Sequence, residues 1–222
     1  MSGEILKHAL RTTVVMIAFA LVGTTMLVYI FNITKTPIAE SEARARMALF
    51  RQIVSDDMHD NPLLEDSIEI QPDALLGHRE ASHVYRARMA GEPVAVILEA
   101  IAPDGYSGDI KLLVAIRADG TINGVRVLAH KETPGLGDYI DITHGPWIRQ
   151  FDNQSLSSRT KAQWKVKKDG GQFDYMVGAT ITPRAIVKAV HKVLEYFEIH
   201  RESLFADEVT ESAPIAATGA AS

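Results

Sequence analysis

Two threonine hydroxyls stand beside small residues near the carboxyl end of the chain, where an amphipathic segment begins. The stretch VGATITPRA places Thr180 and Thr182 just before Pro183. Threonine is favoured before the first turn of a helix and proline within that turn, so we predict a helix over 183–201 with Thr182 as its N-cap. The first N–H groups of a helix lack partners within it and attract anions. A phosphate therefore has a place to bind at this point.

Neighbouring residues favour the same interpretation. Gly178 and Ala179 allow a bulky group to approach the backbone, and Arg184 and Lys188 are positioned to add positive charge. A simple helix cap is the commoner explanation of such threonines, since Thr-Pro caps are common and Thr36-Pro37 in this chain resembles one. From the residues alone, both interpretations stay open.

A second loop of interest is HKETPGLGDYI, residues 130–140, in which Gly135 and Gly137 flank Leu136. Such a loop presents backbone donors and one apolar side chain, which suits a planar, hydrogen-bonding ligand. The alternative is a long connection that needs glycine for left-handed backbone angles. The carboxylates beside it, Glu132 and Asp138, are expected to be solvated.

A third loop, GYSGDI, places Tyr106 and Ser107 between two glycines. Tyr106 is suited to stacking on a ring, although packing is the commoner role of such a residue. The eight histidines form no close pair at metal-ligand spacing, so neither a metal site nor a catalytic residue is predicted.

The elements between these loops predict an α+β fold, an antiparallel sheet flanked by helices. Alternating apolar residues and short turns predict four consecutive strands, over 83–90, 94–101, 109–116 and 121–130. Thr36 and Pro37 resemble the N-cap and first residue of a helix that continues through ESEARARMALFRQIV. A short helix over 145–151 and a further strand over 163–168 complete the prediction.

One uncharged segment, residues 12–33, is apolar throughout. As a helix it is roughly 33 Å long, which is enough to cross the core of a bilayer. Positive charges lie on both sides, so charge alone does not orient it. The expected domains are a cytoplasmic head (1–11), a transmembrane helix (12–33), a helical and loop connection (34–82), a folded domain (83–204) and a flexible tail (205–222).

The amino-acid composition argues against several classes of function. The chain has 222 residues and a formal net charge of −5, and its pI is about 5.9, so a nucleic-acid partner is not expected. The absence of cysteine excludes disulfides, thiolate metal ligands and thiol nucleophiles.

The order of the three loops resembles a known family. GYSGDI, DGTINGVRVLAHKETPGLG and DYMVGATIT are similar to the FMN-binding domain of membrane-bound flavoproteins. This family includes the G subunit of the Rnf electron-transport complex, which is the nearer match, and the C subunit of the sodium-translocating NADH:quinone reductase. With the apolar segment included, the resemblance covers roughly residues 1–200.

In that family FMN is joined by a phosphodiester to a threonine or serine, in a pattern similar to Asp-x-x-(Ser/Thr)-Gly-Ala-(Ser/Thr). The resemblance implies that Thr180 carries FMN, because Asp174, Gly178, Ala179 and Thr180 fit the pattern. Val177 departs from it where a hydroxyl is more usual. The resemblance also implies cofactor contacts from these further residues: Tyr106, Ser107, Glu132, Thr133, Gly135, Leu136, Gly137 and Thr182.

The resemblance implies a function as well. The expected protein is a membrane-anchored electron-transfer subunit, not a stand-alone enzyme, in an Rnf-type complex that couples electron flow between ferredoxin and NAD to ion transport. Its partners would be the lipid bilayer, other membrane subunits and a magnesium-dependent flavin transferase that uses FAD. The flavin domain would lie on the periplasmic side of a bacterial inner membrane. A membrane-tethered assembly or binding module without a redox role is the alternative.

Overall fold

The computed structural model describes residues 2–206, so all but the first two residues of the predicted tail, 205–222, lie outside the described part. The described residues divide into two compact units, with the boundary between Arg46 and Met47. The elements in chain order are α1 (Ser2–Ile53), β1 (Ser67–Ile70), β2 (Ser82–Met89), β3 (Glu92–Gly105), β4 (Gly108–Arg117), β5 (Ile122–Ala129) and α2 (Ile181–Phe205). Three 3₁₀ helices lie between β5 and α2, namely η1 (Asp138–Ile140), η2 (Trp147–Phe151) and η3 (Lys167–Asp169). The predicted α+β class is confirmed.

The first unit consists of most of α1, a single helix whose apolar part is long enough to cross a membrane. The predicted helix start at Thr36-Pro37 is wrong, because α1 runs without a break through Pro37. Proline removes one backbone hydrogen bond. Strong helix formers such as Glu, Ala and Arg follow it in ESEARARMALF and keep the helical conformation favourable on its far side.

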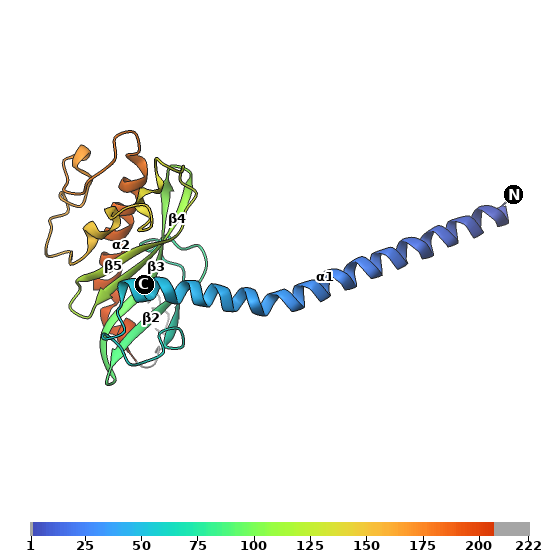
Figure 1. Cartoon of the computed structure of the whole chain (residues 1–222), viewed down its shortest axis with the longest axis horizontal. Coiled ribbons are helices and arrows are strands. Elements are labelled where there is room, and N and C mark those ends of the chain that lie inside the picture. Colours follow the sequence, from blue (N-terminus) through green and yellow to red (C-terminus); the bar gives the residue numbers. More distant parts are fainter. Residues whose placement is uncertain (1, 207–222) are drawn as a thin grey trace, which may run out of the picture. The chain divides into compact units, whose positions relative to one another are not determined.

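The second unit is built on one antiparallel sheet in which every strand pairs with its neighbours in sequence, in the order β1-β2-β3-β4-β5 (Figure 1). All four predicted strands are present. The short strand β1 was not predicted, since it lies in a segment interpreted as a loop. The strand predicted over 163–168 is wrong: Val166 forms one isolated bridge with Phe173, and η3 follows directly.

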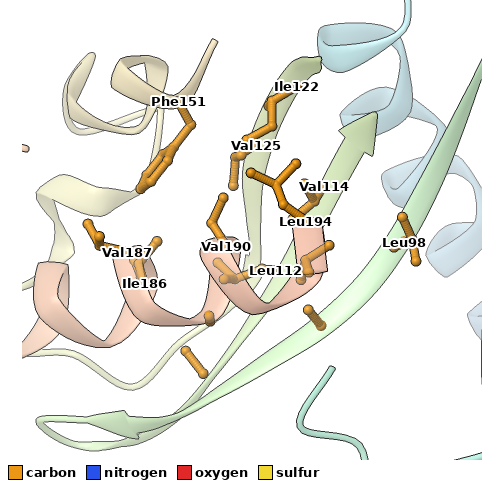
Figure 2. Packing of buried hydrophobic residues seen from close by; sticks show 14 of the residues in the cluster. Leu98, Leu112, Val114, Ile122, Val125, Phe151, Ile186, Val187, Val190 and Leu194 are labelled. Carbon is orange, nitrogen blue, oxygen red and sulfur yellow. The ribbon is translucent and has the colours of Figure 1, made fainter. Parts of the chain in front are cut away.

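Alternation along the strands gives the sheet two apolar faces. On β3, Val96, Leu98 and Ala100 belong to the core that α2 covers, whereas Ala95 and Ile97 belong to the opposite core. Figure 2 shows the first core, where Ile186, Val190 and Leu194 of α2 meet the sheet and Phe151 of η2. Burial of these side chains fixes α2 against the sheet.

The last residues of α1 pack on the other face, within the second unit. Phe50 and Ile53 are buried there. The final carbonyl groups of this helix are satisfied from β5: the Arg126 guanidinium donates to the Gln52 carbonyl oxygen at 3.0 Å, and the Asn123 side-chain amide donates to that of Ile53. Burial lowers the pKa of Arg126.

Gly124 lets this end of α1 approach the sheet. A Cβ atom at Gly124 would lie 2.8 Å from Ile53 Cγ2 and 3.1 Å from Ile53 Cβ. Both distances are shorter than ordinary van der Waals contact, so a side chain there would push the helix end away from β5.

We therefore predict that Gly124→Ala lowers the free energy of unfolding by about 1–3 kcal/mol, the usual cost of overpacking. Urea denaturation of the full chain in neutral detergent, followed by tryptophan fluorescence, measures the change. Gly145→Ala is the matched control, because a Cβ atom there would lie 3.7 Å from its nearest neighbour, the Tyr139 carbonyl oxygen. Equal losses in both variants would contradict the explanation.

Candidate functional site

The three loops singled out in the sequence meet at one cavity of about 230 Å³. The turn between β3 and β4 contributes Tyr106, and the loop after β5 contributes Glu132, Thr133, Leu136 and Gly137. The remaining lining comes from 178–182, the segment in which α2 begins. The complete lining is Tyr106, Glu132, Thr133, Leu136, Gly137, Gly178, Ala179, Thr180, Ile181 and Thr182.

Most of the predicted site residues are thus brought together. Asp174, Ser107 and Gly135 do not line the cavity. Ser107 is bonded to Glu132 of the lining, whereas Gly135 is bonded to Asp138, which does not line it. Ile181 lines the cavity and was missed, because an apolar residue between two threonines carries no distinctive signal.

Glu132 joins the three loops. Its Oε1 accepts a hydrogen bond from the Ser107 N–H at 3.0 Å, and its Oε2 accepts one from the Thr182 hydroxyl. Only 4% of Glu132 is exposed, and Thr182 is 1% exposed. The expectation that Glu132 is solvated is therefore wrong: its carboxylate is buried and hydrogen-bonded at both oxygens.

Gly137 fits against this bridge. A Cβ atom at Gly137 would lie 2.9 Å from Glu132 Oε2 and 3.3 Å from Thr182 Oγ1. Gly135 has a different requirement, since its φ of 75° is in the left-handed region that glycine adopts most easily. Asp138, also buried, accepts the Gly135 N–H at 2.8 Å, so it too departs from the predicted solvation.

The start of α2 differs from the predicted cap. Thr180 occupies the N-cap position and its side chain makes no capping hydrogen bond, whereas Thr182 lies inside the helix and bonds Glu132. The prediction that Thr182 caps the helix is therefore wrong. Thr180 is left with a hydroxyl group at a cavity wall, beside the first N–H groups of α2.

Arg184 and Lys188 do not supply charge to this cavity, contrary to the prediction. The Arg184 guanidinium makes two hydrogen bonds to the Asp169 carboxylate, at 2.5 and 2.8 Å. The Lys188 ammonium pairs with Asp104 at 2.5 Å. Neither side chain lines the cavity at Thr180.

Aromatic residues from the 3₁₀ helices position the segment that leads to Thr180. The Trp147 indole donates to the Asp174 carbonyl oxygen at 2.7 Å, and Gln150 Oε1 accepts the Asp174 N–H at 2.7 Å. The Tyr139 hydroxyl donates to the Ala179 carbonyl oxygen and accepts the Met176 N–H, both at 3.3 Å. Burial raises the pKa of Tyr139, which keeps its hydroxyl protonated as a donor.

This segment ends in a tight turn that exposes its tip. Gly178 has a φ of 92°, and Met176 and Ala179 form an isolated bridge on either side of the turn. Val177, at the tip, is 85% exposed. The Asp174 carboxylate pairs with the Lys167 ammonium, and neither residue lines the cavity.

Comparison with known proteins identifies the class to which this fold and site belong. Residues 105–195 match the FMN-binding domain family, and residues 1–53 match the RnfG N-terminal region. The folded unit therefore contains an FMN-binding domain, and the chain begins with an N-terminal region of the RnfG type. The matched segment 105–195 includes every residue that lines the cavity.

Full-length relatives define the family more closely. The G subunit of the ion-translocating oxidoreductase complex of Pseudomonas aeruginosa is 46% identical over 202 residues, covering 91% of this chain and 94% of the relative. That of Vibrio cholerae is 43% identical, covering 87% and 92%, and that of Shewanella loihica is 47% identical, covering 84% and 88%. The chain belongs to the family formed by the G subunits of ion-translocating oxidoreductase complexes.

The bridge through Glu132 generates a prediction about stability. Thr182→Val removes the donor to a buried carboxylate and should lower the free energy of unfolding by about 1–3 kcal/mol. Urea denaturation of the full chain measures the loss. Thr180→Val is the matched control, since Thr180 makes no capping bond, and should change the value by less than about 0.5 kcal/mol. A larger loss in the control would contradict the assigned role of Thr182.

Proposed function

We propose that this chain is a membrane-anchored electron-transfer subunit that carries FMN covalently on Thr180, within an ion-translocating oxidoreductase complex. One observation carries the proposal: a hydroxyl without a capping role stands where three loops and a helix N-terminus meet. The family supports it, because residues 105–195 match an FMN-binding domain and the relatives are named as subunits of such a complex.

The residues present fit a flavin phosphate at Thr180. A phosphodiester there would place its remaining charge beside the first N–H groups of α2 and the positive end of the helix dipole. Pro183, the third residue of α2, has no N–H, so the donors are those of Ile181 and Thr182. Arg184 and Lys188 are paired with Asp169 and Asp104. The amino terminus of α2 is therefore the main group that would stabilise the negative charge of the phosphate.

The linkage requires a partner, because an unactivated threonine hydroxyl is a poor nucleophile. In the proposed reaction the Thr180 oxygen forms a new bond to the FMN phosphorus of FAD, AMP leaves, and the hydroxyl proton passes to a base of a separate flavin transferase. Asp174 would serve recognition by that transferase. Its carboxylate is more than half exposed and lies outside the cavity, where another protein can reach it.

The size of the cavity supports a flavin that is only partly enclosed. A volume of about 230 Å³ is small for a whole cofactor, since closed ligand sites usually occupy about 300–1,000 Å³. Three exposed apolar side chains line it: Tyr106, Leu136 and Ile181. These side chains would pack against the isoalloxazine ring and leave one edge open to a redox partner.

The bound cofactor would supply the redox chemistry, since isoalloxazine exchanges one or two electrons. The chain's own residues position it. Glu132 holds the β3–β4 turn to the start of α2, and Tyr139 fixes the loop before Thr180. Thr133 and Gly137 line the cavity and are bonded to each other through their backbones. Other membrane subunits of the complex would be the electron donor and acceptor.

Covalent flavin is the direct test. Thr180→Val should abolish flavin fluorescence of the denatured protein and the mass gain of one FMN, whereas Thr182→Val should keep both. Both variants are produced in cells that contain the transferase, and a tryptic peptide spanning residue 180 is examined by mass spectrometry. Flavin retained by Thr180→Val, or an adduct at another residue, would refute the assignment. Wild-type protein without flavin would favour the tethered assembly module.

The proposed location is the bacterial inner membrane, with α1 crossing once and the flavin domain on the periplasmic side. The chain has no cysteine, so single cysteines can be introduced without background. Ala162→Cys, exposed in the folded domain, should react with a membrane-impermeant maleimide in cells whose outer membrane alone is permeabilised. Glu4→Cys should react only after the inner membrane is opened. The reverse pattern would overturn this orientation.

A further inference from the structure

A second cavity, of about 510 Å³, lies between α2 and the segment 161–169. It shares no lining residue with the cavity at Thr180. Lys161, Lys165, Arg184, Lys188 and Lys192 line it, against the two acidic residues Asp169 and Glu195. Positive charge is therefore concentrated here in a chain whose formal net charge is −5.

Part of this charge is already neutralised. Asp169 accepts two hydrogen bonds from Arg184, which raise the pKa of Arg184 and lower that of Asp169. Lys188 pairs with Asp104, which does not line the cavity. After these pairs, Glu195 is the one remaining carboxylate in the described lining, beside Lys161, Lys165 and Lys192. The Lys192 ammonium also donates to the Ala74 carbonyl oxygen at 3.5 Å.

Trp164 lines the cavity and carries a buried donor without an acceptor among the described residues. Trp164 is 5% exposed, and its indole Nε1 has no hydrogen-bond partner among residues 2–206. Buried N–H groups are rarely left without an acceptor. The His191 ring packs on this indole edge to face at 5.5 Å, and its pKa is lowered by burial and by the charge of Lys161.

We propose that this cavity binds an organic phosphate, with its anionic end at Lys161, Lys165 and Lys192. A phosphate group carries negative charge and acceptor oxygens, which complement the lysine ammonium groups. The volume lies within the range of small-molecule sites, and Trp164 and Val187 provide an apolar wall for a ring or a chain. The proposal does not depend on flavin attachment at Thr180.

The two tryptophans make the test specific. The Trp147 Nε1–H donates to the Asp174 carbonyl oxygen, whereas the Trp164 Nε1–H has no acceptor within the described part of the chain. In the full chain labelled with ¹⁵N-tryptophan in neutral detergent, adenosine 5′-monophosphate should shift the Trp164 indole resonance saturably and leave that of Trp147 unchanged. Adenosine, which has the same ring without the phosphate, should produce no shift.

Charge variants distinguish binding in this cavity from nonspecific attraction of an anion to positive charge elsewhere on the domain. Lys161→Gln with Lys165→Gln should weaken binding of adenosine 5′-monophosphate by about tenfold or more, through loss of charge-assisted contacts. Arg79→Gln with Lys111→Gln removes the same charge from exposed positions outside the cavity and should leave binding unchanged. An unshifted Trp147 resonance in each variant shows that the fold is intact. Equal weakening in both pairs overturns the proposal.

The phosphate can belong to a soluble compound or to a lipid headgroup, and a second arm distinguishes them. The full chain is placed in nanodiscs of phosphatidylcholine alone or with phosphatidylglycerol, without added nucleotide. A Trp164 shift confined to the phosphatidylglycerol discs, and lost in the Lys161 and Lys165 variant, identifies the headgroup as the source. If Trp164 responds neither to adenosine 5′-monophosphate nor to phosphatidylglycerol, the site does not exist.

Discussion

The buried carboxylate of Glu132 is the interaction on which the site depends. It joins the Ser107 N–H of the β3–β4 turn to the Thr182 hydroxyl of α2, two groups that lie far apart in sequence. Burying a carboxylate is unfavourable unless hydrogen bonds compensate for the lost water. The turn and the helix must therefore both be in place for Glu132 to be stable. The same requirement fixes the distance between the two sides of the cavity, and Gly137 leaves the space in which this bridge fits.

Two sets of hydrogen bonds position the residues around Thr180. Glu132 accepts the hydrogen bond of the Thr182 hydroxyl. Tyr139, Trp147 and Gln150 bond the backbone of the segment that precedes Thr180. Neither set uses the Thr180 side chain, although this residue occupies the N-cap position. The usual stabilising bond of a threonine at that position, worth about 1 kcal/mol, is absent here. Its absence is intelligible if the oxygen serves a different bond, as the proposed flavin linkage requires.

Local patterns predicted much of the fold, because the meander pairs neighbouring segments. The four long strands follow from alternation and turn residues, and the three loops were identified from their glycines and hydroxyls. The predictions were wrong where a residue's structure depends on groups that are distant in the sequence. Glu132 is buried because its donors come from 25 residues before and 50 residues after it. Alternation in 163–168 does mark burial of Trp164 and Val166, but no neighbouring strand is available, so a strand does not form. Thr36-Pro37 carries a cap signal that the surrounding helix overrides.

The strand order also determines when the cavity can form during synthesis. Neighbour-to-neighbour pairing lets β1 to β5 associate as each leaves the ribosome, since contacts between close segments form early. α2 is the last described element, and it supplies both Thr182 and the cover of one face of the sheet. Until it emerges, Glu132 lacks one of its two donors and the apolar face that α2 will occupy is open to water. A nascent chain stopped before residue 181 would thus have a nearly complete sheet and an incomplete cavity at Thr180. Under the proposed function, a flavin transferase that recognises the assembled cavity would ignore unfinished polypeptides.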